Sequence, residues 1–490
     1  MTLTKAHNRM IQGAIVNVQD FGAIGDGLTD DTAAIQAAID AAANAKLPLF
    51  FPDNGTYLIS KSTSDACLEV TTDDFSIYGN GATLKLKDNQ VDTVTNCLML
   101  YIHGTDTSNR ISWFKCFDLK LDGNSANQPD LTGSGAPPYY NSLQITYVND
   151  FYVERCSSYR SYHNGMTCGS STGTFSNNLC YENIKNGIYV ATDTDRVMCI
   201  KNRCWENNYD NGLPSAPLFG GTSYSGIGFA CDVGHVSDNT CWLNGKGFDI
   251  SFTGSPEESS INFTFSNNVS HNNRGSGIFV TANTYVDKVL TISDCLSYSN
   301  GTAIQANGLN IDNIGYVTVS GGVYRGNSGN GIVAQDGANN FSINGAVCCE
   351  NTLNGLLLAG TSECIINIVS TDNSRYGIEF LDHNALGVAA NTAIVINGYQ
   401  SGNSLGSINN QTLYARTASI SPTFTNVVQY GGAVPTTGSW TRGDFVINTF
   451  PILLGAVSSQ YIVSGWKRVT TGSGNVLNTD WFEARELTGT

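Results

Sequence analysis

Aspartates recur at one position of a repeated segment, and paired carboxylates are the groups that hydrolyse glycosidic bonds. Asp193 follows Gly187 by six residues, and Asp232 follows Gly226 by six. Equivalent positions on neighbouring repeats lie about one strand spacing apart. Glycosidases hold their two carboxyl groups about 5 Å apart for retention and roughly 6.5 to 9.5 Å apart for inversion. We therefore predict that Asp193 and Asp232 supply acid and base or nucleophile, with Asp249 assisting from the next strand. Asx-turns at strand ends are the structural alternative.

Other acids are held in reserve. Glu182 and Glu206 form a second register-matched pair, in CYEN and CWEN, where solvated turn residues are the competing interpretation. Glu257 and Glu258 lie in the loop TGSPEESS near the same repeats. This loop brings Glu257 and Glu258 to a bound polysaccharide only if it folds over the groove that holds the polymer.

Aromatic and basic residues supply candidate binding groups. The segment CSSYRSYHNGM concentrates Tyr159, Arg160, Tyr162 and His163. A lyase acting on a uronic acid needs a base such as Tyr or His and a cation facing the carboxylate, whereas a polar turn explains the same residues without function. Trp205 and Trp242 follow Cys at one repeat position, so we expect them to neighbour one another on the outer face of the stack. There they would stack on a sugar or pack against a second subunit. The substrate-binding residues predicted together are Tyr162, His163, Tyr189, Trp205, Tyr224 and Trp242.

The cysteine pattern favours buried thiols over metal ligands or disulfides. All fourteen lie between Cys67 and Cys364, and Cys156, Cys180, Cys204, Cys241 and Cys295 recur as one interior position would. Tight CxxC or HxxxH clusters and a dense calcium motif are absent from the sequence. No metal and no cofactor are therefore predicted.

A repeat of about 27 residues positions these groups. Each unit reads as a small or apolar residue, Asn, a short polar stretch, Gly and a short β-branched strand, as in CYENIKNGIYV and CWLNGKGFDI. Such a unit buries its apolar face only by stacking on a copy. Identical side chains then lie above one another, at about 4.8 Å per repeat. The asparagines assigned to one column are Asn183, Asn207, Asn244, Asn272, Asn300, Asn327, Asn351 and Asn373, and the repeat near Ala303 is assigned no glycine.

One segment departs from strand patterning. Ile35, Ala38, Ile39 and Ala42 follow helical spacing, and Asp30 and Asp31 precede them as caps. A helix here covers the open end of a stack of parallel strands. Two longer segments, 122–141 and 208–225, are predicted to be loops that shape a groove.

The segment DFGAIGDGLTDDTAAIQAAID followed by FPDNGTYLIS resembles the opening motif of pectate-lyase-like right-handed parallel β-helices. The lead-in KAHNRMIQGAIVNVQDFGA resembles more narrowly the junction before the β-helix of bacteriophage tailspikes. The end, GSWTRGDFVINTFP with SGWKRVTTGSG and WFEA, is similar to a small β-rich module of phage tail proteins. The resemblance implies a homotrimer, attached to a phage tail or baseplate through its N-terminus, that binds and cleaves a bacterial surface polysaccharide such as capsule or O-antigen.

Composition limits the partners. A net charge of −16 argues against nucleic acid and anionic membranes, and no apolar run approaches the roughly 18 residues of a membrane span. The start lacks the basic and apolar halves of a signal peptide, so synthesis in the host cytoplasm is expected. The resemblance to tailspikes implies a place in the virion tail, acting at the bacterial surface.

The predicted fold is all-β, with four parts: a lead-in (1–15), an entering strand and capping helix (16–60), a right-handed parallel β-helix (61–410) and a small β domain for trimerisation or carbohydrate binding (411–490). Hydrolysis is preferred over β-elimination. The remaining alternative is a spike that binds polymer without cleaving it.

Overall fold

The computed structural model describes most of the chain. The described residues are 15–61, 65–129, 139–191, 194, 196–208, 224–231, 233–252, 262–301, 306–381, 392–409, 428–438, 440, 442–456 and 459–487. Within them no helix is long and apolar enough to cross a membrane.

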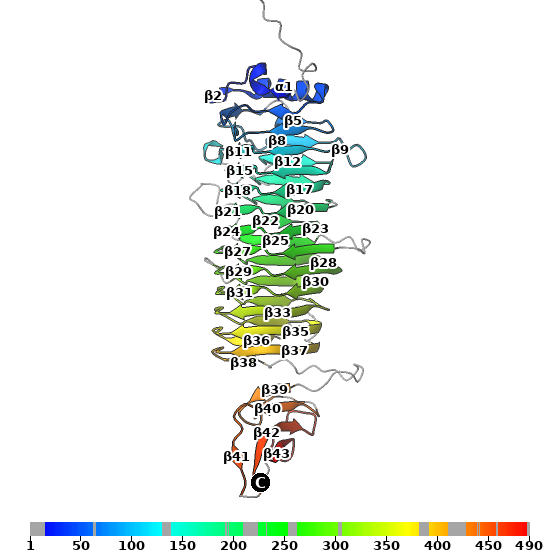
Figure 1. Cartoon of the computed structure of the whole chain (residues 1–490), viewed down its shortest axis with the longest axis vertical. Coiled ribbons are helices and arrows are strands. Elements are labelled where there is room, and N and C mark those ends of the chain that lie inside the picture. The colour runs from blue at the N-terminus through cyan, green and yellow to red at the C-terminus, as the bar shows by residue number, and fades with distance from the viewer. Residues whose placement is uncertain are drawn as a thin grey trace, which may run out of the picture.

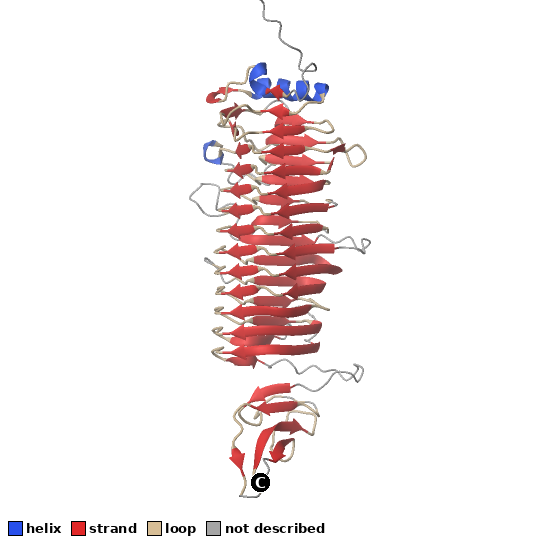
Figure 2. Cartoon of the chain, viewed as in Figure 1, coloured by secondary structure: helices blue, strands red, loops and turns tan. Residues whose placement is uncertain are grey.

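The chain winds into a coil whose strands pair in parallel with their equivalents one turn above and below (Figures 1 and 2). Three ladders result, and the predicted parallel β-helix is confirmed. The first ladder contains β1 (Val16–Asn17), β3 (Leu49–Phe50), β6 (Ser76–Tyr78), β10 (Lys115–Phe117), β14 (Phe151–Glu154), β17 (Thr172–Ser176), β20 (Arg196–Ile200), β23 (Gly234–Ser237) and β26 (Asn262–Ser266).

The second ladder consists of short strands along one edge of the coil (Figure 1). It contains β2 (Asp26–Asp30), β4 (Thr56–Ile59), β7 (Thr83–Leu86), β11 (Lys120–Asp122), β15 (Ser157–Tyr159), β18 (Leu179–Tyr181), β21 (Arg203–Trp205), β24 (Thr240–Trp242), β27 (Val269–His271), β29 (Leu296–Tyr298) and β31 (Val323–Arg325).

The third ladder follows the second after a sharp turn. It contains β5 (Ala66–Val70), β8 (Leu98–His103), β12 (Leu143–Thr146), β16 (Met166–Gly169), β19 (Ile188–Val190), β22 (Ser225–Phe229), β25 (Lys246–Phe252), β32 (Ile332–Gln335), β34 (Leu356–Ala359), β36 (Tyr376–Leu381) and β38 (Gly406–Asn409).

Later turns merge strands of neighbouring ladders. β28 (Ile278–Ser293) and β30 (Leu309–Ser320) join the third ladder to the first, while β33 (Ser342–Cys349), β35 (Ser362–Thr371) and β37 (Thr392–Ser401) join the first to the second. A separate two-stranded pair, β9 (Ile111–Ser112) with β13 (Val148–Asn149), belongs to none of the three ladders, and its Ile111 and Val148 are buried in the same core.

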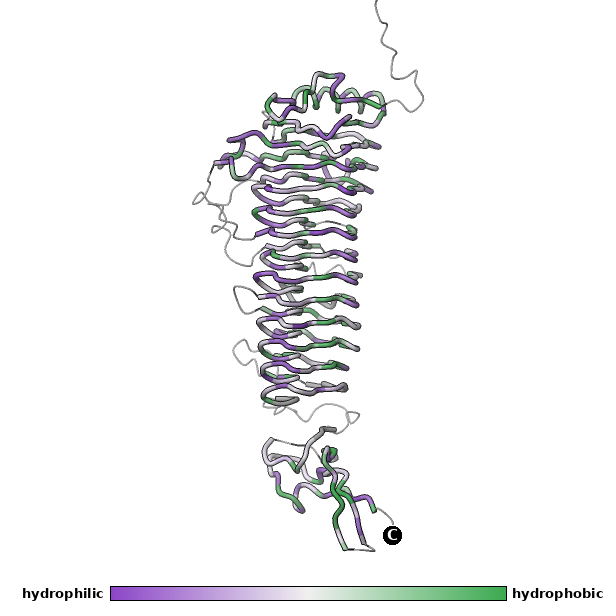
Figure 3. The backbone as a smooth tube through the Cα atoms, turned by 60° about the vertical axis from the view of Figure 1, so that its left-hand side comes forward, coloured by the Kyte–Doolittle hydropathy of each residue, from purple (hydrophilic) through white to green (hydrophobic). Residues whose placement is uncertain are grey.

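Alternation within each strand fills the coil with one continuous apolar core. Hydrophobic and hydrophilic residues are accordingly interspersed within every turn (Figure 3). Cys180, Cys204 and Cys241 pair in register and point inward, as expected of one interior column. The prediction was wrong for Cys156 and Cys295. They lie at the turn before the second ladder, at the position that asparagines fill on the turns between.

Buried asparagines hold the turn between the second and third ladders. Each side-chain oxygen accepts hydrogen bonds from the backbone and side-chain nitrogens of the asparagine one turn earlier, from Asn183 through Asn373. The member on β27's turn is Asn273. The predicted Asn272 lies one residue before it with φ 55°. The repeat near Ala303 was predicted to lack a glycine, and this was wrong. Gly308 fills that position and is stacked between Gly277 and Gly331.

The helix α1 (Thr32–Ala45) covers one end of the coil (Figure 1), as predicted. Its four predicted core residues, Ile35, Ala38, Ile39 and Ala42, are buried. The two aspartates act differently from the expected pair of caps. Asp30 accepts hydrogen bonds from the backbone nitrogen and the hydroxyl of Thr32. Asp31 instead accepts from the backbone nitrogens of Ile24 and Gly25, which follow the short helix η2 (Val18–Phe21) in the chain.

The last described segment forms a separate small sheet. Its strands are β39 (Val428–Gly431), β40 (Phe445–Asn448), β41 (Leu453–Leu454), β42 (Tyr461–Arg468) and β43 (Trp481–Leu487). Its core contains Trp440, Trp466 and Trp481. Those tryptophans therefore serve packing. Trimerisation by this module stays a prediction.

Candidate active site

The candidate site lies at the corner where the second ladder turns into the third. Both long segments leave the coil there. The first follows η3 (Ser125–Asn127), after β11, and the second follows Asn208, after β21. Two turns of the coil, those of β15 and β18, lie between these departures. Residues on those turns therefore lie between the two points at which the long segments begin.

Three charged residues stack on consecutive turns at this corner. Tyr159, Tyr181 and Trp205 pair in register, so the residues after them, Arg160, Glu182 and Glu206, occupy one column. All three are left-handed, with φ of 52°, 55° and 55°. Because the three residues share one backbone conformation, their Cα–Cβ bonds leave the backbone in the same direction. The reserve pair Glu182 and Glu206 is thus brought together, one turn apart.

Burial and charge set the protonation of this cluster. The side chain of Asp122 is only 5% exposed and pairs with Arg160 at 2.5 Å. Burial raises the pKa of Asp122, and Arg160 opposes the rise. Burial also raises the pKa of Glu182. Arg160 opposes that rise, and the charges of Glu206 and Asp122 reinforce it. A carboxyl group with a raised pKa beside a second carboxylate is the arrangement that separates acid from base.

A column of six rings runs beside these charges. Tyr159, Tyr181, Trp205, Trp242, His271 and Tyr298 stack with centroids 4.4 to 6.0 Å apart and planes within 9° of parallel. The predicted neighbouring of Trp205 and Trp242 is confirmed. Their faces cover one another, so only ring edges are presented outward. The column therefore stabilises the coil, and a sugar ring cannot stack flat on Trp205 or Trp242 without separating the stack.

A second column lies on the other side of the same corner. Leu143, Met166, Ile188 and Ile227 pair in register, which places Tyr140, His163, Lys185 and Tyr224 on consecutive turns, each three residues earlier. The Lys185 nitrogen donates to the His163 carbonyl at 2.9 Å. The Lys185 ammonium lies 5.3 Å from the Tyr224 ring centroid. Burial lowers the pKa of Lys185 to about 8. Burial, and secondarily Lys185, lowers the pKa of His163.

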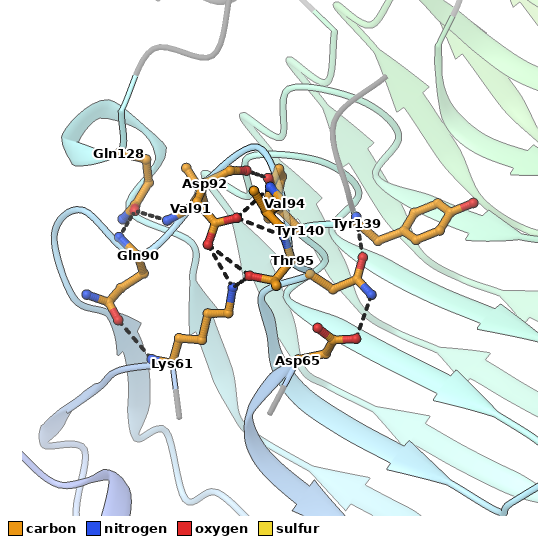
Figure 4. A network of polar contacts seen from close by, with 11 residues as sticks. Lys61, Asp65, Gln90, Val91, Asp92, Val94, Thr95, Gln128, Tyr139 and Tyr140 are labelled. Atoms are coloured by element: carbon orange, nitrogen blue, oxygen red, sulfur yellow. Dashed lines mark hydrogen bonds and ion pairs between the residues drawn. The ribbon is translucent and has the colours of Figure 1, made fainter. Parts of the chain in front are cut away.

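A hydrogen-bond network fixes both described ends of the first long segment (Figure 4). Gln128 accepts from the backbone nitrogens of Gln90 and Val91, at 2.7 and 3.3 Å. At the other end Asn96 accepts from the Tyr139 nitrogen at 2.8 Å, and the Tyr140 hydroxyl donates to the Asp92 carbonyl.

The same network positions a tyrosine over the second column. The Tyr139 ring points away from the network (Figure 4). It lies edge-on to His163, with ring centroids 5.9 Å apart. The side chain is 63% exposed, so it stands at the surface of the corner.

The structure places the remaining predicted residues as follows. Asp193, Asp232, Glu257 and Glu258 lie outside the described residues. Asp249 points outward between buried Phe248 and Ile250, as expected, and is held by Lys246 at 2.8 Å and Ser251 at 3.0 Å. Tyr189, half-buried on β19, has its pKa raised by burial and secondarily by Asp249.

Two predictions about the tyrosine and histidine need correction. Tyr162 is a core residue, packed edge-on against Tyr140 at 5.6 Å, and cannot reach a substrate. His163 is buried as well, although a polar turn was expected to expose it. Both side chains are buried for the same reason: the turn between Arg160 and the start of β16 packs into the core of the coil.

Sequence reasoning missed Asp122 and Lys185. Asp122 is the first residue of the first long segment and pairs in register with Tyr159, so counting back one repeat from Tyr159 would have found it. Lys185 comes three residues after Glu182 and stands directly before the Asn-Gly of its repeat. Among the described residues no group of three or more His, Cys, Asp or Glu side chains is arranged to hold a metal ion.

Comparison with known proteins agrees with this architecture. The model of a family described as rhamnogalacturonase A/epimerase, pectate lyase-like, matches residues 15–213. Mannuronan C5-epimerase AlgE5 of Azotobacter vinelandii is 30% identical over 251 residues, which are 42% of this chain and 24% of that protein. Alginate lyase 7 of the same organism is 38% identical over 115 residues, 23% of this chain and 13% of that protein. The chain thus spans about a quarter or less of these two relatives.

Solved structures show the same fold. The A-module of the Azotobacter vinelandii mannuronan C-5 epimerase AlgE4 superposes with a TM-score of 0.55 at 20% identity, covering 83% of this chain and 99% of that one. Tailspike protein 3 of bacteriophage CBA120 gives 0.57 at 13% identity, covering 92% and 67%. The structural neighbours of this parallel β-helix therefore include a phage tailspike protein and a mannuronan epimerase module.

Proposed function

We propose that this protein cleaves a polysaccharide by hydrolysis, with Glu182 as the acid and Glu206 as its partner carboxylate. The observation that supports this most is their stacking. The two residues share one register and one backbone conformation on neighbouring turns, and burial raises the pKa of Glu182. Neighbouring turns are about 4.8 Å apart, close to the roughly 5 Å between the carboxyl groups of retaining glycosidases.

The chemistry assigned to the pair is double displacement. Protonated Glu182 donates its proton to the glycosidic oxygen as the bond from that oxygen to the anomeric carbon breaks. The Glu206 carboxylate forms a bond to the anomeric carbon. Glu182, now ionised, removes a proton from water, and the resulting hydroxide displaces Glu206. Asp122 and Arg160 sit beside the acid, where the Arg160 charge limits how far the pKa of Glu182 rises.

The biological setting inferred from the tailspike likeness is a phage tail. There the protein would act on capsule or O-antigen as a homotrimer attached through its N-terminus. Asp193 and Asp232, with Asp249, remain the competing catalytic assignment. The described groups favour the glutamates because the Asp249 carboxylate is neutralised by Lys246.

A second candidate reaction is proton abstraction at C5 of a uronic acid, ending in β-elimination or epimerisation. Lys185 supports it, since a lysine whose pKa is about 8 is a competent base near neutral pH. The names of the mannuronan C5-epimerase and alginate lyase relatives point the same way.

The test is to incubate the protein with purified acidic and neutral polysaccharides and to follow three quantities. Hydrolysis shortens the polymer and releases reducing ends without ultraviolet absorbance. Elimination shortens it and creates an absorbing unsaturated end, whereas epimerisation leaves the length unchanged. Binding without any of these changes would contradict the enzymatic proposal.

A further inference from the structure

One tryptophan of the coil lies at the surface. All six tryptophans of the chain are among the described residues, and Trp113 is the one whose side chain is exposed, at 55%. It lies between β9 and β10, at the corner where the third ladder leads into the first. β9 is on the edge of the coil away from the short strands of the second ladder (Figure 1). Trp113 therefore belongs to a different corner from the candidate active site.

The backbone of Trp113 has a conformation that large side chains seldom adopt. Its φ is 66°, in the left-handed region, where the β-carbon crowds the backbone. The Asp74 nitrogen donates to the Ser112 carbonyl at 2.8 Å, and the Trp113 nitrogen donates to the Asn149 carbonyl at 2.9 Å. These bonds place Asp74 and Asp150 in register with Trp113 on the turns before and after it. Both aspartates are left-handed too, with φ of 53° and 57°.

This backbone position suits an aspartate better than a tryptophan. Asp and Asn enter the left-handed region more readily, because their short polar side chains form local hydrogen bonds. Trp113 combines a strained backbone with an apolar ring that stands largely in water. Packing does not offset either cost, since more than half of the side chain is in solvent. Strain of this kind is found where a protein uses the residue for binding or catalysis.

The groups on either side of the ring suit a sugar. Asp74 and Asp150 are exposed, and each lies about one strand spacing, roughly 4.8 Å, from Trp113 along the coil. An indole ring offers a flat apolar surface on which the C–H face of a pyranose packs. Carboxylates are strong acceptors for the hydroxyl groups around the rim of that sugar. The arrangement therefore provides both kinds of contact that a pyranose needs.

The charge beside the ring sets the class of sugar. The carboxylates of Asp73, Asp74 and Asp150 outnumber the two cations nearest in the chain, Arg110 and Lys115. The chain as a whole carries a net charge of −16. Both the local and the overall charge repel a sugar that bears an acid group. The unit that fits here is therefore uncharged.

We propose that Trp113, with Asp74 and Asp150, binds a neutral pyranose unit of a polysaccharide at an accessory site separate from the candidate active site. A polymer held at two places on one protein dissociates more slowly than a polymer held at one. The binding of the neutral sugar does not depend on the proposed hydrolysis. Only its benefit to the cleavage of long chains rests on the proposed function.

The experiment measures dissociation constants by calorimetry for maltohexaose, cellohexaose, mannohexaose and N-acetylchitohexaose, with hexagalacturonate as the acidic contrast. Trp113→Ala removes the ring, and Trp113→Tyr keeps a ring. Asp74→Asn combined with Asp150→Asn removes two charges and keeps residues that accept the left-handed conformation. Tyr316→Ala is the matched control, because Tyr316 is left-handed with φ 54° and is 45% exposed, but has Asn340 in register on the following turn.

The proposal predicts that at least one neutral hexasaccharide binds and that Trp113→Ala weakens its binding about ten-fold or more. The double aspartate variant weakens it to a similar extent, whereas Trp113→Tyr and Tyr316→Ala leave it near wild type. The affinity for hexagalacturonate is the same in Trp113→Ala as in wild type. Failure of every neutral hexasaccharide to bind, an unchanged affinity in Trp113→Ala, or an equal loss in Tyr316→Ala would overturn the proposal.

Trp113→Asn separates binding from packing. Asparagine accepts the left-handed backbone, so we expect a melting temperature at or above that of wild type, together with the loss of affinity seen in Trp113→Ala. A lower melting temperature would show that Trp113 is held for packing, and would overturn the proposal. Chain shortening is a separate readout. Neutral-sugar binding that depends on Trp113, in a protein that cleaves no polymer, would support the accessory site and overturn only the proposed hydrolysis.

Discussion

Replacing Asn207 by alanine tests how the asparagine ladder holds the catalytic corner. The Asn207 side-chain nitrogen donates to the Cys180 carbonyl and to Asn244, each at 2.9 Å. Its oxygen accepts from the backbone and side-chain nitrogens of Asn183, at 3.2 and 2.8 Å. Alanine removes all four hydrogen bonds from a fully buried position.

The size of the effect follows from which groups lose their partners. The Asn183 side-chain nitrogen still reaches the Ser158 carbonyl, and Asn244 still accepts from the Asn207 backbone nitrogen. The Asn183 backbone nitrogen and the Cys180 carbonyl lose their Asn207 contact. Net losses of about 1 kcal/mol per bond, with 1 to 3 kcal/mol for a buried group left unsatisfied, give roughly 3 to 5 kcal/mol.

Hydrogen exchange followed by mass spectrometry measures this locally. We expect peptides covering 180–188 to exchange about 10² to 10³ times faster in Asn207→Ala, since 1.4 kcal/mol corresponds to a factor of ten. The control is Asn344→Ala, which removes one surface hydrogen bond from Asn367 and should change little. Exchange within ten-fold of wild type in Asn207→Ala would refute the view that the ladder fixes this turn.

Three further outcomes are expected. Gly187→Ala should destabilise the coil by about 1 to 3 kcal/mol in a urea titration, since its Cβ would lie 2.6 Å from the Gly226 carbonyl oxygen. A thiol reagent should modify about one cysteine, half-buried Cys349, in the folded protein and all fourteen in denaturant. Hydrolysis products should first appear with retained anomeric configuration by NMR, and inversion would rule out Glu206 as nucleophile.

The repeat made the coil predictable from sequence because stacking imposes identical environments on identical positions. The column of Asn183 and Asn207 and the outward direction of Asp249 follow from register alone. Errors arose where two similar residues compete for one position. Asn272 and Asn273 are adjacent, and only the left-handed conformation of Asn272 shows that Asn273 enters the ladder.

The candidate site was only partly predictable. Register placed Glu182 above Glu206 and Trp205 above Trp242. Sequence could not show that the Trp faces would be covered by one another, because that depends on ring orientation. Nor could it show that Tyr162 turns into the core, or that burial changes the proton affinity of Lys185 and Asp122. Those properties depend on how deeply each turn is buried in the coil, and turn lengths vary from repeat to repeat.

The initial rate of polymer shortening in Glu182→Gln tests the central claim most directly. The control is Glu350→Gln, because Glu350 occupies the same left-handed position further along the coil and pairs with an arginine, Arg325, at 3.0 Å. Loss of a general acid predicts a rate about 10² to 10⁴ times lower in Glu182→Gln, with Glu350→Gln equal to wild type. A Glu182→Gln rate within a few-fold of wild type would contradict the assignment of catalysis to this corner.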